Sequence, residues 1–179
     1  KVFNELSGKT WGIAGLGSIG RRVADVAKAF GCRVVYFSAS GHTYETEFKR
    51  VSFDELLENS DIISIHAPLN DKTNNLFDDA AFAKMKKNAV LLNLGRGPIV
   101  NNAALTKALK ENIIAGAGLD VIDKEPIAAD NPLLEIQDSS KLIITPHIAW
   151  ATVEARNRLF DLVVENIQGF LKGDLKNVC

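Results

Sequence analysis

Three side chains in the second half of the chain, Arg96, Glu125 and His147, are of types that move charge and protons at a carbonyl group. A guanidinium holds a carboxylate and polarises a neighbouring carbonyl. An imidazole gives a proton to the carbonyl oxygen and removes it in the reverse direction. A carboxylate beside that imidazole fixes its tautomer and favours its protonated form. The set therefore suits hydride transfer between a 2-oxo acid and a 2-hydroxy acid.

Each of these residues follows an apolar run that is typical of a strand. Ligands of open α/β sheets bind outside the carboxyl ends of the strands, so we expect Arg96, Glu125 and His147 at one edge. Taken alone, each has a simpler interpretation: a solvated arginine in a turn, a surface acid, a satisfied core histidine. Their occurrence together favours catalysis. We interpret His66 as structural or adjacent to a cofactor, and His42 as a surface residue.

A glycine-rich loop stands between the first apolar run and the first helical pattern. Gly15 permits a tight turn, Gly17 lets the backbone approach phosphate oxygens, and Gly20 lets the helix pack closely on the strand. The helix then begins at about Ser18 and presents free N–H groups and a partial positive charge. The loop therefore predicts that the chain holds the pyrophosphate of a dinucleotide.

The residue that should choose between NAD and NADP is unusual. The second strand of such a fold ends in an Asp or Glu that hydrogen-bonds the ribose 2′-hydroxyl, but here the residue is Ser38, and no carboxylate follows until Glu45. A serine still hydrogen-bonds a ribose and does not repel a 2′-phosphate; alternatively, Ser38 is only a turn residue. The cofactor is thus NAD or NADP, with these candidate phosphate partners: Arg33, His42, Lys49 and Arg50.

Alternating strands and helices must position these residues. Continuous apolar runs predict buried parallel strands at 10–14, 33–37, 61–66, 89–93, 114–119 and 142–145. Helical patterns fall at 19–30, 53–58, 78–85, 102–111 and 151–171, and the 123–132 stretch is predicted as a long loop. This alternation indicates an α/β fold with a doubly wound parallel sheet, a Rossmann fold, in a single dinucleotide-binding domain over residues 1–179.

Composition excludes several other classes of protein. The formal net charge is −1, so no basic surplus points to nucleic acid. No apolar stretch approaches the roughly 20 residues that a membrane span needs, and the start does not resemble a signal peptide. The two cysteines, Cys32 and Cys179, lie far apart in the sequence and do not indicate a disulfide framework, so we expect a reducing, cytoplasmic setting. No metal site is expected.

Five ordered motifs carry a resemblance that covers nearly the whole chain: GLGSIG, HAPLNDKT, NLGRGPIV, GLDVIDKEP and TPHIAWAT. The chain resembles the D-isomer-specific 2-hydroxyacid dehydrogenases, most closely the glycerate dehydrogenase (hydroxypyruvate reductase) branch. The resemblance implies that Arg96 binds the substrate carboxylate and carbonyl, that Glu125 is the acid behind the imidazole, and that His147 donates and accepts the proton. It also implies a set of cofactor contacts: Ser18, Ile19, Ala67, Pro68, Thr73, Leu94, Gly95, Arg96, Asp120, His147 and Ala149.

The family has a second, substrate-binding domain built from both chain ends, and most of it lies outside these 179 residues. We therefore expect this chain by itself to bind cofactor but to turn over a small 2-oxo acid slowly or not at all. A dinucleotide-sensing protein or corepressor on the same fold is the alternative. The family usually forms dimers, so a homodimer is expected, with candidate contacts at Leu105, Leu109 and the 160–170 helix.

Overall fold

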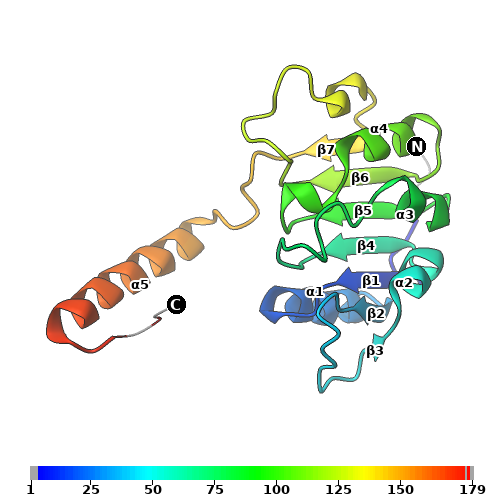
Figure 1. Cartoon of the computed structure of the whole chain (residues 1–179). Helices are drawn as coiled ribbons and strands as arrows, with labels where there is room; N and C mark the ends of the chain where they lie inside the picture. The colour runs from blue at the N-terminus through cyan, green and yellow to red at the C-terminus, as the bar shows by residue number, and fades with distance from the viewer. Residues whose placement is uncertain (1–3, 176, 178–179) are drawn as a thin grey trace. The chain divides into compact units, whose positions relative to one another are not determined.

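The computed structural model describes residues 4–175 and 177, and these contain a seven-stranded parallel sheet (Figure 1). The strands are β1 (Thr10–Ala14), β2 (Arg33–Phe37), β3 (Lys49–Arg50), β4 (Ile62–Ile65), β5 (Val90–Asn93), β6 (Gly116–Leu119) and β7 (Leu142–Ile144). Their order is β3-β2-β1-β4-β5-β6-β7, and all neighbours are parallel. The strand order switches direction between β1 and β4, which is where such sheets bind ligands. The predicted doubly wound sheet is confirmed.

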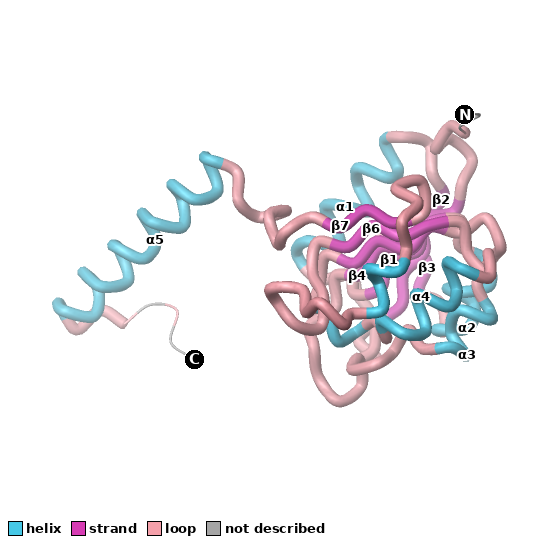
Figure 2. Tube along the Cα trace, turned by 90° about the horizontal axis from the view of Figure 1, so that it is seen from above, coloured by secondary structure: helices cyan, strands magenta, loops and turns pink. Residues whose placement is uncertain are grey.

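Helices cover both faces of this sheet. They are α1 (Ser18–Ala29), α2 (Phe53–Asn59), α3 (Asp79–Lys84) and α4 (Asn102–Lys110), with two short 3-10 helices, η1 (Gly97–Ile99) and η2 (Pro132–Glu135). Figure 2 shows α1 on one face and α2, α3 and α4 on the other. The larger core cluster includes Phe82 and Leu105, and a smaller one next to α1 includes Ile13 and Tyr36.

The chain divides into two compact units, Lys1–Thr145 and Pro146–Cys179. The first holds the sheet, and the second holds α5 (Val153–Lys172), a 20-residue helix with Thr152 as its N-cap and no buried residue. A single domain over residues 1–179 stays a prediction. Within the described residues, no helix is both long enough and apolar enough to cross a membrane.

Two of the expected dimer contacts are wrong. Leu105 and Leu109 are both fully buried, at 0% exposed. They belong to the larger hydrophobic core of the first unit, so their side chains are not offered to a second copy. The two leucines are four residues apart and therefore lie on one face of α4, and this face packs into the core.

Most predicted elements match the structure within one or two residues, but three were missed. β3 is a two-residue edge strand of two cations, Lys49 and Arg50, which carries no apolar signal. The 3-10 helices η1 and η2 are single turns that begin with Gly97 and Pro132. Such short pieces are formed by tertiary contacts and turn residues rather than by periodicity.

Candidate active site

The loop between β1 and α1 is tightly packed at two of its three glycines. Gly15 has φ +101°, a left-handed conformation that favours glycine, and a Cβ there would lie 2.6 Å from the backbone N of Ala67. A Cβ on Gly20 would lie 2.1 Å from the carbonyl O of Gly15. Gly17 differs, because a Cβ there would have no heavy atom of the protein within 4 Å. The backbone at Gly17 is therefore accessible to a ligand.

The first turn of α1 is also open. In the other four α-helices, an N-cap side chain accepts a hydrogen bond from the third backbone N–H of the helix. The caps are Ser52, Asp78, Asn101 and Thr152. The N-cap of α1 is Gly17, which has no side chain to accept one. The first N–H groups of α1 and its positive dipole end are therefore available to an anion.

Two pockets flank this loop. One, of about 170 Å³, is lined by Gly15, Leu16, Gly17, Ser38, Ala39, Ser40, Tyr44, His66, Ala67, Pro68, Asn70 and Thr73. The other, of about 460 Å³, is lined by Ile19, His66, Ala67, Pro68, Leu69, Leu94, Gly95 and Arg96. The fold thus gathers most of the predicted cofactor residues from four separate segments. Ser18 lies beside Ile19 in a shallow hollow along α1, and Asp120 lines neither pocket.

The hydroxyl of Thr73 forms hydrogen bonds within the protein. It donates to the carbonyl O of Pro68 at 2.7 Å and accepts from the backbone N–H of Asn70 at 2.9 Å. The side chain is fully buried. Thr73 therefore holds the Ala67–Pro68 segment in place, and this segment lines both pockets.

The turn that carries Arg96 is fastened by a buried asparagine. Asn93, 1% exposed, accepts from the backbone N–H of Gly95 at 3.1 Å and donates through Nδ2 to the carbonyl O of Arg96 at 3.1 Å. Arg96 itself donates through Nη1 to the carbonyl O of Gly95 at 2.8 Å. A Cβ on Gly97 would lie 1.8 Å from the carbonyl O of Ile122, so the next loop packs directly on this turn.

The two acids of the following loop are held differently. Asp120 is 7% exposed, and its Oδ1 accepts from the hydroxyl of Thr145 at 2.6 Å. Glu125 is exposed, and its Oε1 accepts from the backbone N–H of Ile122 at 3.2 Å. Asp120 is therefore fixed inside the first unit, whereas the carboxylate of Glu125 lies at the surface.

His147 belongs to the second unit. Its φ of +54° places it in the left-handed region, which is uncommon for residues other than glycine. The indole Nε1 of Trp150 donates to the carbonyl O of His147 at 2.9 Å and stabilises this turn. Glu125 and His147 belong to different units, so their pairing stays a prediction, as does the cofactor contact of Ala149 in the same turn.

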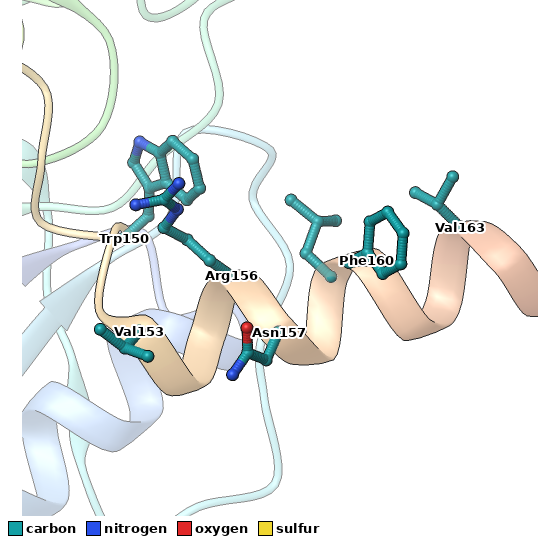
Figure 3. A pocket seen from close by; sticks show the side chains of 7 residues that line it. Trp150, Val153, Arg156, Asn157, Phe160 and Val163 are labelled. Atoms are coloured by element: carbon teal, nitrogen blue, oxygen red, sulfur yellow. The ribbon is translucent and has the colours of Figure 1, made fainter.

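The second unit also has a groove of about 610 Å³ along α5, lined by Trp150, Val153, Arg156, Asn157, Leu159, Phe160 and Val163. Figure 3 shows the side chains of Trp150, Arg156, Phe160 and Val163 on one side of the helix. None of the predicted site residues lines this groove.

His66 is the residue whose part in the site the sequence left open. It lines both pockets, and its Nε2 lies 3.0 Å from Ser64 Oγ. That oxygen in turn accepts from the indole N–H of Trp11 at 2.9 Å. Burial lowers the pKa of His66 to about 4, so its imidazole is neutral at pH 7. Its position one residue before Ala67 was the only sequence signal for this place.

Sequence comparison decides the family. Residues 1–149 match the D-isomer specific 2-hydroxyacid dehydrogenase family, NAD binding domain. The chain belongs to this family. The D-isomer specific 2-hydroxyacid dehydrogenase match confirms the resemblance seen in the five motifs, and it gives the class of cofactor as a nicotinamide dinucleotide.

Two curated relatives and one solved structure illustrate the similarity. A glyoxylate reductase of Korarchaeum cryptofilum is 41% identical over 174 residues, covering 96% of this chain and 52% of the relative. A hydroxypyruvate reductase of Blautia hydrogenotrophica is 44% identical over 176 residues, covering 97% and 54%. The structure of an acyclic imino acid reductase (Bsp5) in complex with NADPH and D-Arg matches with a TM-score of 0.88 at 35% identity, covering 99% and 56%. The chain therefore spans about half the length of these three relatives.

Proposed function

We propose that this chain forms the cofactor-binding half of a reductase that converts glyoxylate or hydroxypyruvate to the D-2-hydroxy acid. The observation that carries the proposal is the uncapped N-terminus of α1 beside an open Gly17, with two pockets lined by the predicted cofactor residues. These features fit an anionic, elongated ligand such as a dinucleotide. The two curated relatives, named glyoxylate reductase and hydroxypyruvate reductase, support the choice of substrate.

Each reacting residue has a separate task. Arg96, of which one N–H already bonds Gly95 O, binds the substrate carboxylate and polarises the adjacent carbonyl with its remaining donors. His147 gives a proton to the carbonyl oxygen, and Glu125 holds the imidazole in the right tautomer. When bound, the dinucleotide supplies the hydride. His66, neutral at pH 7, is not suited to be the proton donor.

A substrate panel tests this proposal. Glyoxylate, hydroxypyruvate and pyruvate are offered with NADH and NADPH to the whole protein that carries this chain. We expect glyoxylate or hydroxypyruvate to be reduced fastest. His147→Ala should lower kcat about a thousandfold, because general acid catalysis contributes about 10²–10⁴, and should leave cofactor affinity within about twofold. Absence of reduction with every pair would favour the dinucleotide sensor instead.

The setting and the assembly are proposed in the same way. Cys32 is a buried free thiol that donates to the carbonyl O of Leu6 at 3.2 Å, and burial raises its pKa. A thiol in this form suits the reducing cytoplasm. A homodimer is proposed because the family usually forms dimers. Light scattering of the purified protein would measure the oligomeric state.

A further inference from the structure

The edge of the smaller pocket has hydroxyl groups where a carboxylate is usual. Ser38 follows β2, is 6% exposed, and its Oγ lies 3.1 Å from the Oγ of Ser40. Ser38, Ala39 and Ser40 all line the pocket that also includes Gly15 and Gly17. No Asp or Glu is among the residues lining it. This end of the pocket therefore does not repel a phosphate attached to the ribose.

A cation lies on the other side of the same loop. The backbone N–H of Gly41 donates to the carbonyl O of Ser38 at 3.0 Å, which turns the chain back. Nη1 of Arg50 donates to the hydroxyl of Thr43 at 2.9 Å. Nη2 of Arg50 lies 3.9 Å from the position of a Cβ on Gly41. The guanidinium thus lies against the turn that begins at Ser38.

The short edge strand β3 explains how Arg50 comes to this place. Arg50 pairs in parallel register with Tyr36 of β2, and the N–H of Val51 donates to the carbonyl O of Tyr36. Arg50 is exposed, and within the described residues none of the ion pairs includes it. An arginine without a carboxylate partner can offer its remaining N–H groups to a phosphate, for which the planar guanidinium is well suited.

The neighbouring cations are directed elsewhere. Lys49 interacts with the carboxylate of Glu55. Hydrogen bonds with Ser52 lower the pKa of Glu55 most, and the positive charge of Lys49 lowers it further. Arg33 donates to the hydroxyl of Thr10, at the opposite end of β2 from Ser38. Of the two arginines and the lysine suggested by the sequence, only Arg50 lies against the turn that begins at Ser38. Lys49 provides a matched control of equal charge on the same strand.

A second arginine strengthens the positive character of the loop. The guanidinium of Arg21 lies 4.8 Å from the ring centroid of Tyr44, and its Nη1 donates to the carbonyl O of Glu45 at 3.4 Å. Tyr44 lines the pocket, and its backbone N–H donates to the hydroxyl of Tyr36 at 3.1 Å. The guanidinium groups of both arginines thus contact the loop between β2 and β3, of which Tyr44 lines the pocket.

We propose that Ser38, Ser40 and Arg50 form a binding site for the 2′-phosphate of an adenosine ribose, so that the chain prefers NADP(H) to NAD(H). The inference rests on the proposed dinucleotide function and names the form of the cofactor. In the bound state, Arg50 donates to the phosphate oxygens, and the hydroxyls of Ser38 and Ser40 replace the ribose contact that an acid normally makes.

The test measures the dissociation constants of NADPH and NADH for the chain by fluorescence of the reduced nicotinamide. We expect NADPH to bind at least about tenfold more tightly, which is about 1.4 kcal/mol. Arg50→Met should reduce this preference by about tenfold or more, whereas Lys49→Met should not change it. Ser38→Asp should shift the preference towards NADH. As an independent probe, 2′,5′-ADP should compete with NADPH better than 5′-ADP does.

Three outcomes would overturn the inference. Tighter binding of NADH by the unchanged chain would show that no 2′-phosphate site exists. Equal weakening of NADPH by Arg50→Met and Lys49→Met would reduce the effect to general surface charge. Equal weakening of NADPH and NADH by Arg50→Met would assign Arg50 to the loop's structure. Binding of neither cofactor would instead contradict the proposed function on which the inference rests, and circular dichroism of each variant checks that it is folded.

Discussion

Two glycine-bearing turns at the same edge of the sheet have glycines for different reasons. In the turn after β5, a Cβ on Gly97 would lie 1.8 Å from the carbonyl O of Ile122. In the loop after β1, a Cβ on Gly17 would meet no protein atom within 4 Å. Packing therefore explains the glycine at position 97, and it gives no reason for the one at position 17.

The polar groups of the two turns differ in the same way. Asn93 satisfies both a backbone N–H and a carbonyl of the Arg96 turn, so that turn is complete within the protein. At the N-terminus of α1, no N-cap side chain accepts a hydrogen bond, so the first backbone N–H groups of the helix are available to another acceptor. The comparison teaches that the Arg96 turn is completed by hydrogen bonds within the protein, whereas the loop at Gly17 leaves backbone N–H groups for the ligand of the proposed function.

The largest effect is expected when the packed turn is broken. Gly97→Ala forces the backbone at Ile122 to move, and we expect it to lower the free energy of unfolding by about 3 kcal/mol. Urea denaturation followed by circular dichroism measures this loss. A loss below about 1 kcal/mol would mean that the two loops are not in close contact.

Asn93 sharpens the comparison within the same turn. Asn93→Ala leaves a buried N–H and a carbonyl without their partner, which costs about 1–3 kcal/mol. Asn93→Asp keeps the acceptor for Gly95 and loses the donor to Arg96 O, so we expect it to shift Arg96 as well. Urea denaturation measures the stability of each variant, and the KM for the 2-oxo acid reports the position of Arg96. Equal KM values for both variants and the unchanged protein would remove Asn93 from the positioning of Arg96.

His66 lies between the two turns and links stability to pH. Its pKa is about 4 in the folded protein and about 6.5 when unfolded. The unfolded chain therefore binds the extra proton between these values, and stability rises with pH through this window. We expect about 2 kcal/mol to be lost as the pH falls from 6.5 to 4, after allowing for partial exposure of the ring. His66→Asn should remove that part of the pH dependence, and an unchanged profile would contradict the assignment.

Repetition made much of the fold predictable from the sequence. The predicted strand at 10–14 and the predicted helix at 53–58, which begins after a capping box at Ser52, are confirmed, because apolar runs and helix caps act locally. The strand β3 was not predicted, because Lys49 and Arg50 form a strand only through pairing with β2. The close contact between Gly97 and Ile122 was not predicted either, because it joins residues from two different loops.

The candidate site was predictable in its residue types and less so in its arrangement. The motifs gave Gly15 and Arg96, and the end of the second strand gave Ser38; the fold places these residues on two pockets that share His66. The two hydrogen bonds by which Asn93 fixes the Arg96 turn could not be predicted from the sequence, because they depend on how the turn folds back. The pair of Glu125 and His147 stays a prediction.

The smallest effect on the fold, and the most direct test of dinucleotide binding, is expected from Gly17→Ala. The added methyl group has no protein atom within 4 Å, and the φ of −76° suits alanine, so the free energy of unfolding should change by less than about 0.5 kcal/mol. In the proposed complex, the same methyl group stands where the pyrophosphate approaches the backbone. Titration of NADPH and NADH against both proteins should show at least about tenfold weaker binding by the variant, roughly 1.4 kcal/mol. Equal affinity of the variant and the unchanged chain would contradict the account.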